Sequence, residues 1–240
     1  MISALSPYRP INLGFGTKLV AKQRDWHHVA EELKAENLKL ASYDNTLLPL
    51  LGDLNGKTVL DYGAGPGVLA KAINKLGGDI KVYDINPDMR MQAGQKIGIE
   101  NVYATTEAIP KVSFDHVICN LVLCIVPEDE VKRIAHNIKL ALKPGGSAYV
   151  GFCNPKIFNI KESQLDFRFP TGHQYEENHD YKKVKKEGEY EIIESHRPTE
   201  WYQKMFEAAG FKVDELIYTP EYKLHENNIK DFVIFKLTQP

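Results

Sequence analysis

The sequence predicts an α/β fold with a mostly parallel sheet and helices on both of its faces. From residue 57 onward, short apolar runs alternate with segments in which apolar residues recur at helical spacing. Strands separated by helices of this length need crossover connections, which make the strands parallel. A glycine-rich turn at residues 63–67 follows the first apolar run, and open α/β sheets bind their ligands at such strand-to-helix turns.

The composition describes one soluble globular domain. The 240 residues are 43% apolar and 26% charged, and 30 basic side chains against 32 acidic ones leave a net charge of −2. Such a chain lacks the basic character of proteins that bind nucleic acid or anionic membranes. No window approaches the roughly 20 apolar residues of a membrane span. We therefore expect neither nucleic acid nor a membrane as a partner.

The cysteines favour a cytoplasmic location. Cys119, Cys124 and Cys153 form no C-x-x-C pair, and an odd number suits a reducing compartment better than a disulfide scaffold. Their spacing offers no zinc cluster, and no metal is expected. The first ten residues hold two prolines and no apolar segment of signal-peptide length.

The chain divides into four segments of a single domain: N-terminal helices at 1–55, a core at 56–154, an insertion at 155–197, and a final helix with strands at 198–240. Two helices are expected in the first segment, the earlier one marked by Trp26, Val29, Ala30 and Leu33, and the later one by the leucines between Leu47 and Leu54.

The core segment alternates strands with helices. Apolar runs predict strands at 57–61, 79–84, 101–105, 114–120 and 147–152. Helical spacing predicts helices at 68–76, 87–97 and 127–142, with a turn at Pro144-Gly145-Gly146 before the fifth strand.

The alternation stops in the insertion. Residues 155–197 show no clean periodicity before 189–194, and the lysines at 182–186 are surrounded by acids, which is typical of a solvated face. A helix is predicted at 198–209, with Pro198 at its first position and Gly210 as its stop. Two further strands are expected at 211–219 and 230–237, paired with each other.

The most informative feature is Asp61-Tyr62-Gly63-Ala64-Gly65-Pro66-Gly67, between a predicted strand and a predicted helix. Glycines there let the backbone approach a ligand, although such turns also serve packing alone. The dinucleotide fingerprint requires a glycine at its sixth place, where this chain has Val68. Pyrophosphate is therefore disfavoured, and the Asp61 carboxylate favours a cationic ligand.

Residues 59–67 resemble the first motif of class I S-adenosylmethionine (SAM)-dependent methyltransferases, of the small-molecule kind. Asp84 lies 23 positions after Asp61, where that family places an acid on the two ribose hydroxyls; a helix cap ahead of Asn86-Pro87 is the alternative. Residues 114–120 resemble the family's fourth strand, and 140–146 its turn before the fifth. The resemblance implies a Rossmann-like sheet of seven strands with an antiparallel strand at one edge, and SAM as the cofactor.

The resemblance also implies cofactor contacts. The main chain near Asn120 would hold the methionine amine, Ile85 would line the adenine pocket, and Tyr43 would lie over the cofactor, with simple packing as the alternative for Tyr43. The sequence at 105–110 departs from the family pattern, which leaves an adenine contact by Glu107 or a merely exposed side chain open. The expected cofactor-binding residues are Tyr43, Asp61, Gly63, Ala64, Gly65, Gly67, Asp84, Ile85, Thr106, Glu107 and Asn120.

Methyl transfer from a sulfonium chiefly requires orientation of the acceptor. A general base is needed where the acceptor is a hydroxyl or a protonated amine, and histidine suits that task. His173 and His196, in or beside the insertion expected to cap the acceptor pocket, are the catalytic candidates; surface histidines without a role are the alternative.

The sequence thus predicts an enzyme that methylates an oxygen or nitrogen of a small molecule. Two alternatives stay open: an RNA or protein acceptor, and a SAM-binding protein without catalysis. The oligomeric state is not indicated by the sequence.

Overall fold

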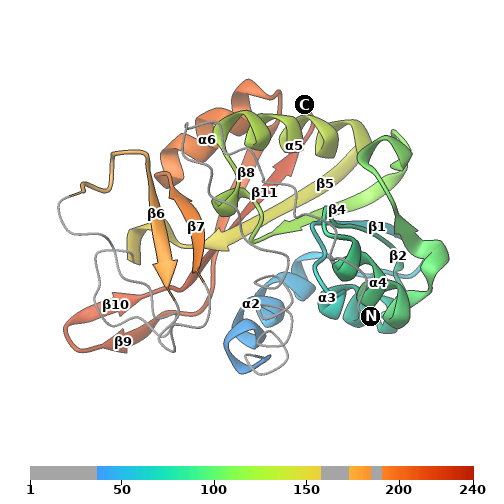
Figure 1. The fold of residues 1–240 in the computed structure, drawn as a ribbon, viewed down its shortest axis with the longest axis horizontal. Helices are drawn as coiled ribbons and strands as arrows, with labels where there is room; N and C mark the ends of the chain where they lie inside the picture. Colours follow the sequence, from blue (N-terminus) through green and yellow to red (C-terminus); the bar gives the residue numbers. More distant parts are fainter. Residues whose placement is uncertain (1–36, 158–172, 185–190) are drawn as a thin grey trace, which may run out of the picture.

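A computed structural model describes residues 37–157, 173–184 and 191–240. Its main sheet has seven strands in the order β3-β2-β1-β4-β5-β11-β8, as predicted (Figure 1). The strands are β1 (Thr58–Tyr62), β2 (Asp79–Tyr83), β3 (Val102–Tyr103), β4 (Phe114–Asn120), β5 (Leu142–Cys153), β8 (Lys212–Tyr218) and β11 (Phe232–Thr238). The expected helix around Trp26 lies outside the described residues.

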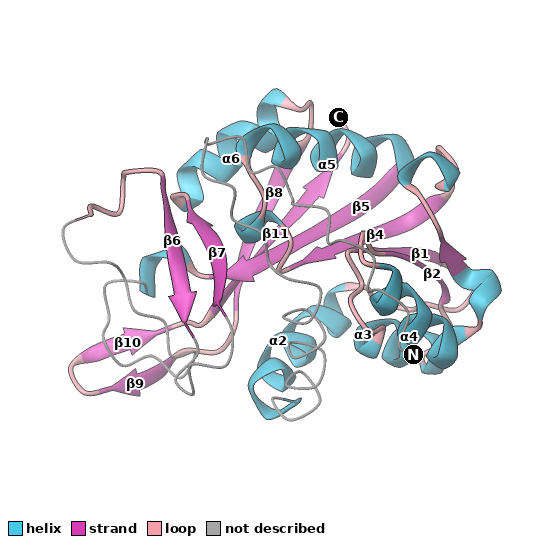
Figure 2. Cartoon of the chain, in the orientation of Figure 1, coloured by secondary structure: helices cyan, strands magenta, loops and turns pink. Residues whose placement is uncertain are grey.

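Helices cover both faces of the sheet, as Figure 2 shows. One face carries α2 (Asn37–Leu50), α3 (Val68–Lys75) and α4 (Pro87–Ile97), and the other carries α5 (Glu128–Ala141) and α6 (Thr199–Ala208). Successive residues of a strand point to opposite faces. Val59 therefore belongs to the apolar core under α2 and α3, whereas Leu60 belongs to the core under α5 and α6.

The antiparallel strand is β11, which pairs with both β5 and β8. It lies next to the edge strand β8, and the remaining pairs from β3 to β5 are parallel. The expected pairing of the last two predicted strands is confirmed. Between them the chain forms an additional small hairpin, β9 (Tyr222–Leu224) and β10 (Asn227–Ile229), which the sequence did not indicate.

The predicted turn at 144–146 lies within β5. Leu142 already pairs with Phe114, and pairing resumes at Ser147 opposite His116, so residues 143–146 form a bulge. The helix expected at 127–142 accordingly ends at Ala141. The bulge is stabilised by the side chain of Lys143, as described next.

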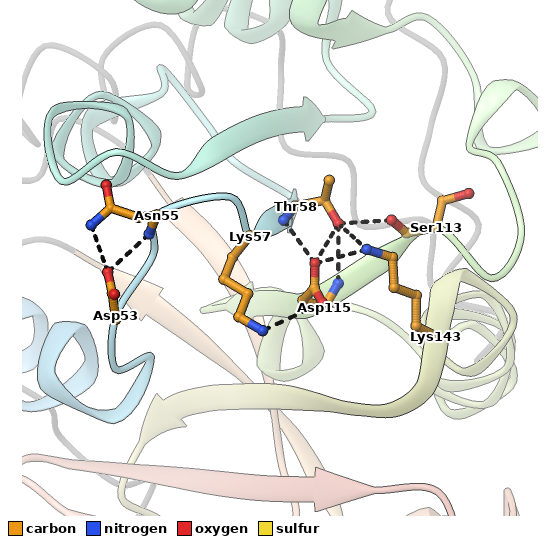
Figure 3. A network of polar contacts seen from close by, with 7 residues as sticks. All are labelled: Asp53, Asn55, Lys57, Thr58, Ser113, Asp115 and Lys143. Atoms are coloured by element: carbon orange, nitrogen blue, oxygen red, sulfur yellow. Dashed lines mark hydrogen bonds and ion pairs between the residues drawn. The ribbon is translucent and has the colours of Figure 1, made fainter.

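A polar network surrounds the bulge at the amino ends of β1 and β4 (Figure 3). One carboxylate oxygen of Asp115 accepts hydrogen bonds from the Thr58 amide (2.9 Å), the Thr58 hydroxyl (2.8 Å) and the Lys143 ammonium (2.8 Å). Lys57 forms an ion pair with the other oxygen at 3.8 Å. Burial acts to raise the pKa of Asp115, but these bonds from Lys143 and Thr58 hold it well below its usual range.

Residues 155–197, expected to be an insertion, contain more regular structure in their described part than the sequence suggested. After a short 3-10 turn, η4 (Pro155–Ile157), they form an antiparallel hairpin of β6 (His179–Val184) and β7 (Glu191–His196). This hairpin and β9–β10 both lie beyond the carboxyl end of β5, on the left in Figure 1. β7 contacts the 3-10 turn η3 (Leu123–Ile125), which follows β4.

Within the described residues, no helix has the length and apolar character needed to cross a membrane.

Candidate functional site

The glycine loop follows β1 at the carboxyl edge of the parallel strands. Gly63, Gly65 and Gly67 have φ values of +84°, +52° and +74°, which favour glycine. A Cβ on Gly63 would overlap Val122, and one on Gly67 would lie 2.8 Å from the Cα of Ala93. Packing therefore explains these two glycines.

Gly65 differs from its two neighbours, because a Cβ built there meets nothing within 4 Å. Its positive φ accounts for a glycine here without any packing constraint, and the space beside its backbone is open.

Asp84 follows β2 and faces this loop. One carboxylate oxygen accepts a hydrogen bond from the Gly65 amide (2.8 Å), and the other accepts one from the Asn86 amide (2.8 Å). The cap of α4 is Asn86, whose side chain accepts hydrogen bonds from the Asp88 and Met89 amides. The helix-cap alternative for Asp84 is thereby removed. Each of its oxygens can accept a further hydrogen bond.

Three carboxyl groups make this edge of the sheet acidic. Asp61 is 2% exposed. Burial, together with repulsion from Asp84 and Asp44, raises the pKa of Asp61 to about 7. Burial also raises the pKa of Asp44, on α2, to about 6, and it raises that of Asp84. A cationic ligand would relieve this unfavourable burial of negative charge.

Tyr43 and Asn120, predicted separately, are brought together by the fold. The Tyr43 hydroxyl of α2 donates a hydrogen bond to the side-chain oxygen of Asn120, the last residue of β4. Asn120 pairs with Gly151 on β5, where a Cβ would overlap the Tyr43 hydroxyl. Leu121, the next residue, has a φ of +57°, a sparsely populated conformation for a branched side chain.

The remaining cofactor candidates are Ala64 in the glycine loop, Ile85 directly after Asp84, and two residues that follow β3, Thr106 and Glu107. Ala64 donates its amide to the Tyr83 carbonyl (3.0 Å), which extends the β1–β2 pairing into the loop. Ile85 is 64% exposed and leaves an apolar side chain accessible beside the loop. The Thr106 hydroxyl donates to Glu107 (3.1 Å) in the 3-10 turn η2 (Thr106–Ala108) after β3. The pKa of Glu107 is lowered by hydrogen bonds from its own amide, Thr105 and Thr106.

The two catalytic candidates are linked through a third histidine. The ring of His173 stacks on that of His179 at 4.2 Å, and His179 lies 4.9 Å from His196. His173 is exposed and lies 3.6 Å from the Glu177 carboxylate. His196 is 1% exposed, and its Nε2 lies 2.7 Å from the Tyr175 carbonyl. Burial lowers the pKa of His196 to about 4, so it is neutral at physiological pH.

Sequence reasoning missed several residues of this region. Asp44 follows Tyr43 by one position, and its contribution appears only once α2 is packed against β1. Gly151 lacks any turn signal because its role is to leave space for Tyr43. Arg197 is 3% exposed and bonds to the loop after β4, which no local pattern indicates. In the described part of the chain, no cluster of three or more His, Cys, Asp or Glu is suited to a metal ion.

Comparison with known proteins gives a family and a fold. The family model described as "Methyltransferase domain" matches residues 26–216. A solved structure of an S-adenosylmethionine-dependent methyltransferase from Clostridium acetobutylicum superposes with a TM-score of 0.60 at 12% identity, covering 90% of this chain and 98% of that one. At this identity the likeness concerns the fold.

Curated relatives match parts of the chain. The ribosomal protein L11 methyltransferase of Cupriavidus metallidurans is 33% identical over 95 residues, which are 38% of this chain and 30% of the relative. The ubiquinone biosynthesis O-methyltransferase of Paraburkholderia phymatum is 30% identical over 112 residues, which are 43% and 47% of the two chains. The matched part of the chain thus spans 30% and 47% of the length of these two relatives.

Proposed function

The chain belongs to the methyltransferase-domain family, and from this premise we propose that it transfers the methyl group of SAM to an oxygen or nitrogen of a small-molecule acceptor. The observation that carries the proposal is the open backbone of Gly65 opposite Asp84, beside the buried carboxyl of Asp61. Carboxylates beside an open backbone suit a cation and disfavour a pyrophosphate.

The chemistry of the site supports this cofactor. Asp84 retains acceptor capacity on both oxygens for two hydroxyls of a ribose. Ile85 offers an exposed apolar surface for a base. Asn120, oriented by Tyr43, lies at the end of β4, where the amino acid part would bind. Asp61 and Asp44 favour the positive charge. When bound, SAM supplies a methyl group on a positively charged sulfur, which is a good leaving group.

We place the acceptor side in the insertion at 155–197, whose β6–β7 hairpin lies beyond the carboxyl end of β5. His173 is proposed as the proton acceptor, because it is exposed and its Nδ1 lies 3.6 Å from the Glu177 carboxylate, which can orient the ring. The buried, neutral His196 is proposed to hold the stack of histidines in place. The chain's own task is orientation, which contributes on the order of 7–11 kcal/mol in well-aligned reactions.

A small-molecule acceptor is favoured by the net charge of −2, which gives little attraction for nucleic acid phosphates. The relatives named above are an L11 methyltransferase and an O-methyltransferase, so a protein acceptor is the second candidate. The three cysteines are buried and none of them forms a disulfide, which supports the proposed cytoplasmic location.

Calorimetric titration with SAM tests the proposal. Asp84→Ala is expected to weaken SAM binding by about tenfold or more, since it removes charge-assisted hydrogen bonds. Asp79→Ala is the matched control, because Asp79 lies at the opposite end of β2 from Asp84 and its exposed carboxylate forms an ion pair with Lys81; binding should be unchanged.

No heat with SAM, or displacement of SAM by NADH, would refute the proposal. Release of S-adenosylhomocysteine is then measured over a panel of small hydroxyl and amine compounds, with ribosomal protein and bulk tRNA as the other arms. Turnover with ribosomal protein alone would move the assignment to a protein acceptor.

A further inference from the structure

Arg197 is a buried cation that joins two separate segments. It follows β7 and precedes α6, and only 3% of it is exposed. Its Nη1 donates to the Leu123 carbonyl (3.0 Å), and its Nη2 donates to the Val126 carbonyl (2.8 Å). The planar guanidinium thereby spans η3, the turn that follows β4. A buried charge is expensive unless its donors are satisfied, so this arrangement is strongly specified.

Aromatic rings fix the guanidinium in this position. Its central carbon lies 5.1 Å from the centre of the Trp201 ring, and the Tyr202 hydroxyl lies 3.4 Å both from Nη1 and from the Leu123 carbonyl. Tyr202 is fully buried against Phe152 of β5. The contact between Arg197 and η3 is therefore part of the rigid core of the domain.

The two segments that Arg197 joins belong to the two halves of the proposed site. On one side, η3 begins three residues after Asn120, and the intervening Leu121 has a φ of +57° and donates its amide to the Gly151 carbonyl (2.8 Å). On the other side, Arg197 is adjacent to His196, whose ring contacts the Tyr175 carbonyl and His179. A displacement at the end of β4 would thus be transmitted to the histidine stack.

We propose that Arg197 is a positioning residue that fixes the β6–β7 hairpin to the loop after β4, so that cofactor binding at Asn120 sets the place of the acceptor-side histidines. This inference rests on the proposed function. The guanidinium acts through the carbonyls of Leu123 and Val126 and contacts neither cofactor nor acceptor. A lysine cannot replace it fully, because one ammonium does not reproduce the planar fork.

Hydrogen exchange with S-adenosylhomocysteine as the probe tests the inference. In the wild type, saturating S-adenosylhomocysteine is expected to slow exchange in the glycine loop and also, by about fivefold, in peptides covering 191–199. In Arg197→Met, slowing in the glycine loop should persist while slowing at 191–199 disappears. A purely structural role would instead speed exchange at 191–199 equally with and without the probe, leaving the ratio unchanged.

Arg133→Met is the matched control, because Arg133 pairs with Glu130 on the surface of α5 and its side chain is 65% exposed. In this variant the ratio of the exchange rates at 191–199 without and with S-adenosylhomocysteine should equal that of the wild type. Where Arg197→Met does not fold, Arg197→Lys is used, and the ligand-dependent slowing at 191–199 should fall by at least half.

An unchanged ratio at 191–199 in the Arg197 variants overturns the inference and leaves the proposed function standing. Failure of the wild type to bind S-adenosylhomocysteine or SAM overturns both.

Discussion

Carboxyl groups at the two ends of the β1–β4 strand pair have pKa shifts of opposite direction. At the amino end, Asp115 accepts three hydrogen bonds on one oxygen and pairs with Lys57 on the other, and its pKa is lowered. At the carboxyl end, Asp61 is buried and Asp84, which follows the neighbouring strand β2, is partly buried, and burial raises the pKa of both. The first end is closed by its own side chains, whereas the second holds negative charge that a ligand can compensate.

This difference separates stability from binding along the same two strands. Satisfied charges at the amino end contribute to folding, because removing Asp115 leaves Lys143 and Thr58 without their shared acceptor. Uncompensated charges at the carboxyl end oppose folding and favour a cation. Variants at the amino end should therefore alter stability without altering SAM binding. Variants at the carboxyl end should alter SAM binding more than stability. Exceptions are expected only where a residue of the carboxyl end also carries packing.

Gly67→Ala is such an exception and should cause the largest loss of stability. The new Cβ would meet the Ala93 backbone at 2.8 Å, at a φ of +74°, so we expect a loss of about 3 kcal/mol in the free energy of unfolding. Urea denaturation measures it. Gly56→Ala, with a φ of +70° and open space, should cost only about 1 kcal/mol. Equal losses would show that packing at Gly67 is unimportant.

Asp115→Ala should lower the free energy of unfolding by about 2 kcal/mol at pH 7, because Lys143 and Thr58 lose their shared acceptor. The pKa of Asp115 is lowered by folding, so its contribution is present above about pH 4 and is lost as the pH falls further. The gap between variant and wild type should narrow below that pH. SAM affinity should be unaffected, and a weaker affinity would contradict the separation of the two ends.

Gly65→Ala and Gly56→Ala introduce the same kind of backbone strain, the first at the proposed ligand site and the second away from it. Gly65 and Gly56 both have positive φ values and open space around the missing Cβ, so their alanine variants should lose about 1 kcal/mol of stability each. Only Gly65→Ala should weaken SAM binding, by about tenfold, because the methyl group occupies the space proposed for the ligand. Calorimetry measures the SAM affinity of both variants. If Gly65→Ala binds SAM as well as Gly56→Ala does, the ligand lies elsewhere.

Asp61→Asn should have the clearest pH signature. Folding raises the pKa of Asp61 to about 7, so the carboxyl destabilises the protein increasingly between about pH 4 and pH 7. Relative to the wild type, Asp61→Asn should gain up to about 4 kcal/mol over that interval. SAM affinity of the wild type should rise with pH through about 7 and that of the variant should stay flat. Parallel pH profiles would remove Asp61 from the site.

Much of the fold could be predicted because its signals are local. The strand at 114–120 and the helix at 87–97 were predicted with the observed bounds, since apolar periodicity and the Asn86-Pro87 start depend on neighbouring residues only. The β9–β10 hairpin was missed because its turn carries His225 at a φ of +53°, where a recognisable hairpin turn would have asparagine or glycine. The bulge in β5 depends on Lys143 reaching Asp115, a contact distant in sequence.

The candidate site shows the same limit. The glycine loop and Asp84 could be predicted as neighbours because they belong to one strand-turn-helix-strand unit, in which they lie 19 positions apart. The contact between Tyr43 and Asn120 spans 77 positions, and that between Arg197 and Leu123 spans 74. Neither contact leaves a pattern in nearby residues. The role of His173 and His196 in catalysis stays a prediction.

The tight fit of Tyr43 against Gly151 has a consequence for how related chains diverge. A side chain at position 151 would overlap the Tyr43 hydroxyl, and the two positions lie on different elements, α2 and β5. Neither can change freely while the other is retained. Across homologous sequences, positions 43 and 151 should covary, with a residue larger than glycine at 151 accompanied by a smaller one at 43.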